Sequence, residues 1–167
     1  APNEYLKRHD RIGQYIHWKL CNHYGKKTAK NWYEHHPDSV TEIGNVTLLW
    51  DFSIHTDRTI KANRPDIVIK DKTSRKCTLI DMAVPSDNNL AVKEFEKLSK
   101  YKDLEIEISK MWHMRTKVVP VIVGALGMIK KGTAELIKAI PGSLDINEMQ
   151  KITLTGTAHI LRKTLSM

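Results

Sequence analysis

The sequence has 167 residues, enough for one domain of ordinary size, and its 41% hydrophobic and 28% charged residues exclude a disordered tail. Its 27 Lys and Arg residues outnumber the 19 Asp and Glu residues, and the formal net charge of +8 is typical of a protein that binds a polyanion, most often nucleic acid. The two cysteines, Cys21 and Cys77, form no CxxC pair, so a disulfide scaffold is excluded and a structural zinc site is not expected.

No segment of the sequence is expected to cross a membrane or to direct secretion. The longest apolar run, 118–129, contains Pro120, Gly124 and Gly127 and is too short to span a bilayer. No secretory signal is recognisable at the start. Because the sequence begins with Ala1, we expect it to be a piece of a longer polypeptide.

The first predicted element is a helix over residues 4–24, because Leu6, Ile12, Ile16 and Leu20 recur at helical spacing. The other side of this helix is polar and mainly basic. Its charged and titratable side chains are Lys7, Arg8, His9, Arg11 and Lys19.

Apolar residues predict strands further along the chain. After a short helical segment over residues 28–35, alternating apolar positions favour a strand over 46–54. Two shorter strands, 66–70 and 77–84, are separated by a polar turn over 71–75 and are expected to form a hairpin.

The second half of the chain alternates helices with one strand. An apolar stripe predicts a long helix over 90–114, and the next apolar run, 118–123, is typical of a buried strand. Within that run, Pro120 indicates a bulge or a sheet edge, because proline has no amide hydrogen to donate. Two helices, over 133–139 and 146–165, are expected to close the chain. The residues of the stripe are Phe95, Leu98, Tyr101, Leu104, Ile108 and Met111.

This order of elements predicts an α/β fold in which helices flank a mixed sheet. The whole chain, 1–167, is expected to be one domain. It comprises an N-terminal helical segment over 1–45, a sheet core with the long helix over 46–123, and C-terminal helices over 124–167.

Two aspartates carry the chemical signal of the sequence. Asp66 follows Pro65 at the start of the first hairpin strand, and Asp81 interrupts an otherwise apolar stretch of the second. Two carboxylates brought together across a sheet repel each other unless a cation lies between them. Mg²⁺ or Mn²⁺ takes oxygen ligands and assists phosphodiester cleavage, so the pair indicates a metal-dependent site.

The spacing of these residues resembles the PD-(D/E)xK signature of restriction-like nucleases, with one departure. Ala83 stands where that signature has a lysine, two residues after Asp81. Lys97 can supply the missing ammonium group from the predicted long helix, which is expected to pack over the hairpin. Tyr101, four residues later, is its neighbour on one face of that helix.

The sequence as a whole resembles the restriction-like endonuclease domain at the C-terminus of non-LTR retrotransposon polyproteins. In that family the lysine of the signature is displaced onto the helix, with a tyrosine four residues later, which matches Lys97 and Tyr101. The resemblance covers nearly the whole chain. The matching segments are Tyr5-Leu6-Lys7-Arg8-His9, His17-Trp18-Lys19-Leu20-Cys21, Leu49-Trp50-Asp51-Phe52, Arg64-Pro65-Asp66-Ile67-Val68, Ile80-Asp81-Met82-Ala83-Val84-Pro85, Glu96-Lys97 with Lys100-Tyr101, Val123-Gly124-Ala125-Leu126-Gly127 and Ile160-Leu161-Arg162-Lys163.

The resemblance implies a metal-dependent endonuclease that nicks chromosomal DNA, so that the exposed 3′ hydroxyl primes reverse transcription of the element RNA. Asp66 and Asp81 would hold Mg²⁺ or Mn²⁺, Lys97 would stabilise the transition state or orient water, and Tyr101 would support Lys97. The implied partners are double-stranded DNA, the element RNA and the reverse transcriptase segments of the parent polyprotein, with a homodimer if both strands are cut. The implied location is the nucleus, with no membrane partner.

Five basic residues are the candidates for contacts with the DNA backbone. They are Lys7, Arg8, Arg11, Lys19 and Arg64. Such contacts supply affinity that depends on salt and not on base sequence. For each residue the alternative is an ordinary solvated basic surface.

Each catalytic candidate also has a structural interpretation. Asp81 can form a salt bridge with Lys70 or Lys76 across the hairpin, Lys97 can belong to a solvated helix face, and Tyr101 can simply fill the core. The chain can accordingly be a nuclease fold that only docks DNA for a larger polyprotein. A remoter alternative is an interaction domain without enzymatic activity.

Other polar residues carry weaker signals. Glu94 can orient Lys97 or act as an outer metal ligand, and Asp51 can add a third carboxylate, whereas Asp57 is expected to be a solvated strand end. The remaining histidines and cysteine considered as metal ligands are expected to lack partners at ligand spacing. These residues are Cys21, His23, His35, His36 and His55.

Overall fold

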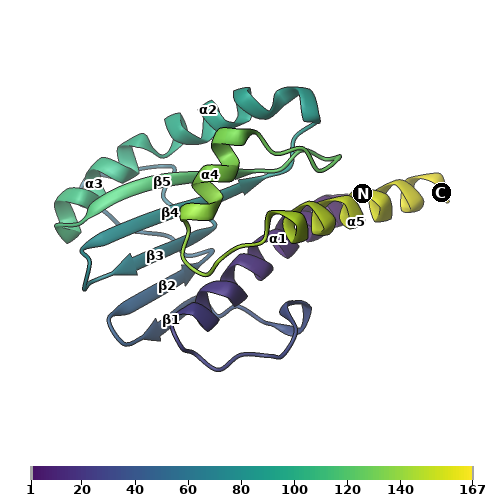
Figure 1. Ribbon diagram of the computed structural model, residues 1–167. Coiled ribbons are helices and arrows are strands. Elements are labelled where there is room, and N and C mark those ends of the chain that lie inside the picture. Colours follow the sequence, from purple (N-terminus) through teal and green to yellow (C-terminus); the bar gives the residue numbers. More distant parts are fainter. Residues whose placement is uncertain (1, 167) are drawn as a thin grey trace.

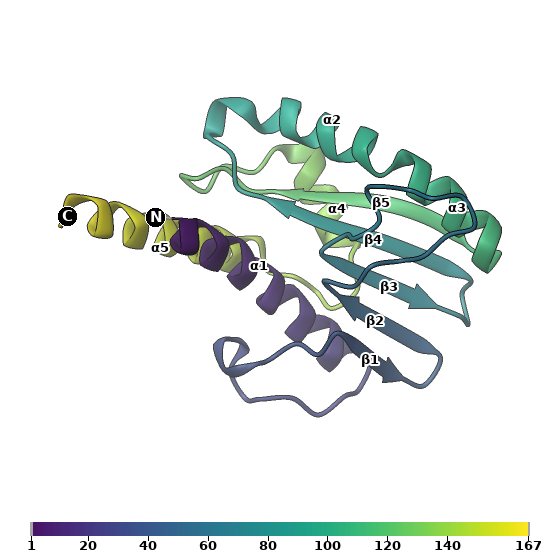
Figure 2. The same ribbon diagram turned by 180° about the vertical axis from the view of Figure 1, so that it is seen from behind.

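A five-stranded mixed sheet with helices on both faces forms the protein in the computed structural model, which describes residues 2–166 (Figures 1 and 2). This arrangement confirms the predicted mixed α/β class. The elements in chain order are α1 (Pro2–His23), η1 (Trp32–Glu34), β1 (Val40–Ile43), β2 (Val46–Trp50), β3 (Ile67–Asp71), β4 (Lys76–Ala83), η2 (Asp87–Asn89), α2 (Leu90–Lys100), α3 (Lys102–Trp112), β5 (Arg115–Ile122), α4 (Lys131–Ala139) and α5 (Ile146–Leu165), where η denotes a 3₁₀ turn.

The strands lie in the order β1-β2-β3-β4-β5. Neighbours are antiparallel from β1 to β4, and β5 runs parallel to β4 after a crossover through α2 and α3. The predicted hairpin is therefore confirmed as β3–β4. Its register pairs Ile67 with Ile80, so the next residues outward, Asp66 and Asp81, stand opposite each other.

The sheet separates two apolar cores. Helices α1, α4 and α5 contribute to the core on one face, and α3, the bend between α2 and α3, and the loop between β2 and β3 contribute to the core on the other. Alternation along β4 places Ile80 and Met82 in the first core and Leu79 in the second. Asp81, by the same alternation, faces the side of α2 and α3.

Helix α1 packs closely against the sheet and along α5 (Figure 1). Gly13 permits the close approach to the sheet, because an added Cβ would lie 2.5 Å from the Met82 methyl carbon and 2.9 Å from the Trp50 ring. None of the described helices combines the length and the apolar character that crossing a membrane requires.

Several predicted boundaries are wrong. The strand expected over 46–54 ends at Trp50, because Asp51 adopts a left-handed backbone with φ of 47°. The segment 28–35 contains only the turn η1, and β1 was not predicted. The predicted helix over 90–114 is divided at Tyr101 into α2 and α3.

The predicted apolar stripe is only partly buried, and strand β5 lies at the edge of the sheet. Phe95 and Leu98, assigned to the apolar stripe, are exposed on α2, whereas Tyr101, Leu104 and Ile108 are buried. Strand β5 is an edge strand, as Pro120 indicated, and it is buried because helices cover both of its faces.

Candidate active site

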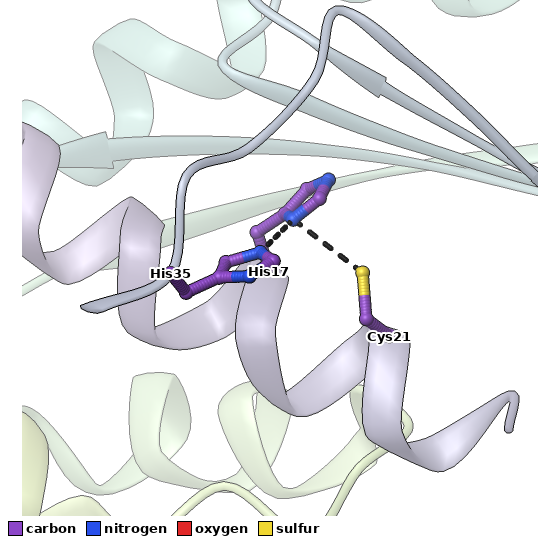
Figure 3. Close-up of side chains that lie close together, drawn as sticks. All are labelled: His17, Cys21 and His35. Atoms are coloured by element: carbon purple, nitrogen blue, oxygen red, sulfur yellow. Dashed lines mark hydrogen bonds between the residues drawn. The ribbon is translucent and has the colours of Figure 1, made fainter. Parts of the chain in front are cut away.

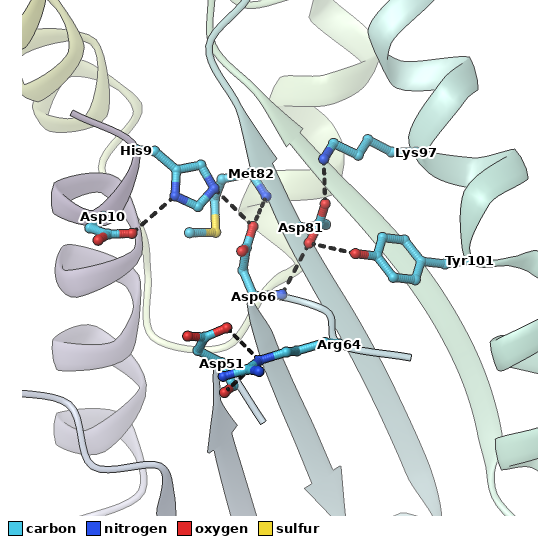
Figure 4. A network of polar contacts seen from close by, with 9 residues as sticks. All are labelled: His9, Asp10, Asp51, Arg64, Asp66, Asp81, Met82, Lys97 and Tyr101. Atoms are coloured by element: carbon cyan, nitrogen blue, oxygen red, sulfur yellow. Dashed lines mark hydrogen bonds and ion pairs between the residues drawn. The ribbon is translucent and has the colours of Figure 1, made fainter. Parts of the chain in front are cut away.

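Two carboxylates meet at one end of the β3–β4 hairpin (Figure 4). The Asp66 amide donates a hydrogen bond of 3.0 Å to Asp81 Oδ1. In return, the Met82 amide donates one of 2.8 Å to Asp66 Oδ2. Backbone amides near the end of the hairpin thus hold both carboxylates in place. The Asp81 side chain is only 4% exposed, which makes its charge costly to bury without a partner.

Helix α2 and the bend after it supply the partners of Asp81. Lys97 Nζ lies 2.6 Å from Asp81 Oδ2, and the Tyr101 hydroxyl donates a hydrogen bond of 3.2 Å to Asp81 Oδ1. The structure therefore brings together all four residues singled out for catalysis, from the β3–β4 hairpin, helix α2 and the bend after that helix (Figure 4). The alternative salt bridge to Lys70 does not form, since Lys70 Nζ lies 4.0 Å above the Trp112 ring.

The structure adds one residue, His9, to this cluster. His9 lies on α1, and its Nε2 is 3.1 Å from Asp66 Oδ2, while its Nδ1 is 3.1 Å from Asp10 Oδ1. Burial by itself lowers the pKa of His9, but the hydrogen bond and charge of Asp66 outweigh it and raise the pKa to about 9. The imidazole is therefore a cation at neutral pH.

The pKa values of the two carboxylates are shifted in opposite directions. Burial and the nearby Asp66 charge raise the pKa of Asp81, although Lys97 opposes the shift. Burial also acts on Asp66, but the hydrogen bond and charge of His9 prevail and lower the pKa of that carboxyl. Burial and the Asp81 charge raise the pKa of Tyr101, so its phenol stays protonated and donates to Asp81.

The neighbouring acidic residues have other partners. Glu94 Oε2 lies 3.0 Å from Lys130 Nζ and therefore pairs away from Lys97. Asp51 lies beside the cluster and pairs with Arg64 at 2.8 Å (Figure 4), and Asp57 is exposed as expected. A third carboxylate ligand from these residues would require Asp51 to leave its arginine.

The predicted DNA-binding residues fall in three places. Lys7, Arg8 and Arg11 line a cavity of about 310 Å³ between α1 and α5, where Lys151 and Arg162 add positive charge. Within it Arg8 is largely buried and its guanidinium donates to the Thr157 hydroxyl at 3.0 Å. Lys19 lies further along α1, beside Trp18. Arg64 lies next to the carboxylate cluster, paired with Asp51.

A second cluster of metal-ligating side chains was not predicted. His17, Cys21 and His35 come together beside α1, although Cys21 and His35 were expected to lack partners (Figure 3). The i, i+4 spacing of His17 and Cys21 on a helix was a usable signal, whereas the approach of His35 depends on the loop after α1.

Neither a protein-family model nor a curated protein matches the chain.

Proposed function

We propose that this chain is a metal-dependent DNA endonuclease with a PD-(D/E)xK-like core, which hydrolyses one phosphodiester bond at the site of Asp66 and Asp81. One observation carries the proposal: two carboxylates face each other at the end of a hairpin, with Lys97 and Tyr101 on one of them. Holding two such charges together costs free energy, which a protein tolerates where the charges have a function.

The donor set fits a hard divalent cation. Asp66 and Asp81 offer carboxylate oxygens, the ligands that Mg²⁺ and Mn²⁺ prefer, and they are the residues that would hold the ion. Both carboxylates already attract positive charge, since one contacts His9 and the other Lys97. When bound, such an ion supplies a polarised phosphoryl oxygen and a bound water of lowered pKa.

The protein's own side chains supply orientation and charge. Lys97 Nζ lies beside the carboxylates on a side chain that is 18% exposed, so it can reach a phosphate that approaches from solvent. Its ammonium group would stabilise the negative charge that develops on the phosphate oxygens. Tyr101 holds Asp81 by its hydroxyl, and His9 holds Asp66 from the other face of the sheet.

The proposed substrate is double-stranded DNA, in keeping with the net charge of +8. By the resemblance described above, a nick would expose a 3′ hydroxyl that primes reverse transcription of the element RNA in the nucleus. The reverse transcriptase segments of the parent polyprotein would then act on that end.

A DNA-docking module is the second candidate function. It is favoured by one observation, that His9 and Lys97 already pair with the two carboxylates, so the cluster has protein cations of its own. The basic cavity between α1 and α5 would then be the functional surface, and the carboxylates would be structural.

Nicking of supercoiled plasmid DNA in the presence of Mn²⁺ tests the proposal. We expect Asp66→Asn and Asp81→Asn to abolish nicking, and Asp57→Asn, at an exposed aspartate outside the cluster, to leave it unchanged. DNA binding should survive in all three variants. If the wild-type chain binds DNA but leaves plasmids intact with Mn²⁺ and with Mg²⁺, the docking function is correct.

A further inference from the structure

We propose that His17, Cys21 and His35 form a site for a transition-metal ion, with Zn²⁺ the expected occupant, separate from the carboxylate cluster (Figure 3). The three side chains come from two segments, α1 and the residue that follows η1. Along α1, the site lies about two turns beyond His9, since eight residues separate His9 from His17.

The geometry brings three donor atoms to one point. His17 Nδ1 lies 2.7 Å from His35 Nε2 and 3.6 Å from Cys21 Sγ, and the ligand atoms all lie within 4.8 Å of one another. All three side chains are buried. The side-chain amide of Gln14 donates a hydrogen bond of 2.8 Å to the His35 carbonyl, which ties the loop that carries His35 to α1.

The donor set selects the kind of metal. Two imidazole nitrogens and one thiolate suit Zn²⁺, which binds nitrogen at about 2.0–2.1 Å and sulfur at about 2.3 Å, whereas Mg²⁺ requires oxygen. Around a tetrahedral ion these ligand atoms would be separated by roughly 3.3–3.6 Å. The distance of 3.6 Å between His17 Nδ1 and Cys21 Sγ already fits. The distance of 2.7 Å between His17 Nδ1 and His35 Nε2 is shorter than this, so the His35 ring would move outward when the ion binds.

Room remains for a fourth ligand. A cavity of about 170 Å³ opens at the three side chains, and Asp38 and His36 also line it. Either a water molecule or one of these two side chains can complete a tetrahedral shell. The carboxylates of Asp66 and Asp81 do not line this cavity, so the two proposed metal sites are independent.

Titration of the chain with Co²⁺, followed by visible absorption, tests this site directly. We expect one Co²⁺ per chain to give the d–d bands of a tetrahedral ion and a thiolate-to-cobalt charge-transfer band, both removed by excess Zn²⁺. The charge-transfer band should be lost in Cys21→Ala, and binding should weaken at least tenfold in His35→Ala. The matched control is Cys77→Ala, at the other buried cysteine, which should keep the band.

A second measurement needs no variant. Adding Zn²⁺ to the chelator-treated wild-type chain should raise its thermal unfolding temperature by several degrees, because a ligand that binds only the folded state stabilises it. A wild-type chain with native circular dichroism but neither the charge-transfer band nor the Zn²⁺-dependent shift would overturn the proposal. Plasmid nicking enters neither readout, so failure of the nuclease proposal would leave this result intact.

Discussion

Asp66 and Asp81 face each other at the end of the β3–β4 hairpin, and each is balanced by a cation from a different helix. Lys97 sits on the more buried carboxylate, where an uncompensated charge would cost most. His9 sits on the more accessible one. Under the proposed function, Lys97 would meet a phosphate and His9 would hold Asp66.

Replacing Lys97 tests the first of these roles. We expect Lys97→Met to slow Mn²⁺-dependent nicking by about 100-fold or more, the usual loss when one charge-stabilising donor is removed from an active site. Lys93→Met is the matched control, because Lys93 lies one turn earlier on α2 and pairs with Glu96. Equal activity of the two variants, with both folded by circular dichroism, would remove Lys97 from the mechanism.

Titration of His9 tests whether it forms an ion pair with Asp66. An NMR titration of the histidine ring protons should find the pKa of His9 near 9, and Asp66→Asn should bring it toward or below its ordinary value of 6.5. The pair should stabilise the fold by about 1–3 kcal/mol when His9 is charged. A wild-type His9 that titrates near 6.5 would contradict the ion pair.

The same shift has a consequence for stability that depends on pH. Because the pKa of His9 is raised on folding, the stabilisation is fully present below pH 6.5 and is lost as the pH rises through about 9. The difference in unfolding free energy between the wild-type chain and His9→Gln should therefore shrink across that window, as measured by urea denaturation at each pH. A constant difference would show that His9 contributes by packing alone.

Some residues of the site could be predicted from the sequence, and others could not. Asp66 could be predicted because it follows Pro65 at the start of a strand, and Asp81 because it interrupts an apolar strand. Lys97 and Tyr101 were predicted from the resemblance to a nuclease family in which the lysine is displaced onto the helix. His9 could not be found, since it meets Asp66 only through the packing of α1 on the sheet. The same holds for His35, which depends on the path of a loop.

The β3–β4 hairpin is the element that sets the site. Its two strands and its polar turn could be predicted from the sequence. Its register alone puts the two aspartates opposite each other. The end of β2 could not be predicted, because the apolar pattern continues to Ile54 while the backbone turns at Asp51. The division between α2 and α3 escaped prediction for the same reason, since the helical spacing runs on through Tyr101.

Helix α1 must lie close to the sheet for His9 to reach Asp66. We therefore expect Gly13→Ala to destabilise the fold by about 1–2 kcal/mol, because the added methyl group meets Met82 and the Trp50 ring. Gly132→Ala, on α4, is the matched control: a Cβ there has open space, and the better helix propensity of alanine should leave stability equal or higher. Equal effects in urea denaturation would mean that α1 can move away from the sheet at little cost.

At the scale of the whole molecule, part of the excess positive charge lines the cavity between α1 and α5. The cavity between α1 and α5 carries Lys7, Arg11, Lys151 and Arg162 with only Glu4 and Glu148 as acidic neighbours. The mixed α/β class followed from the order of elements, but the pairing of α1 with α5 joins opposite ends of the chain. No local pattern in the sequence reports such a contact.

Salt dependence distinguishes this surface from ordinary basic residues. The triple variant Arg11→Gln, Lys151→Gln and Arg162→Gln should weaken DNA binding and reduce the slope of log affinity against log salt by about 2–3. A triple variant with the same charge, Lys72→Gln, Lys76→Gln and Lys117→Gln, changes exposed residues near the β3–β4 turn and should alter the slope much less. Equal changes in fluorescence anisotropy titrations would assign the affinity to net charge alone.

Anomalous diffraction from crystals of the protein grown with Mn²⁺ and a short DNA duplex tests the proposed metal site at Asp66 and Asp81 most directly. We predict an anomalous peak bonded to one oxygen each of Asp66 and Asp81, with the Lys97 ammonium group turned toward a phosphate. A map with ordered DNA, no peak between these carboxylates and the Lys97–Asp81 ion pair intact would contradict a metal site there.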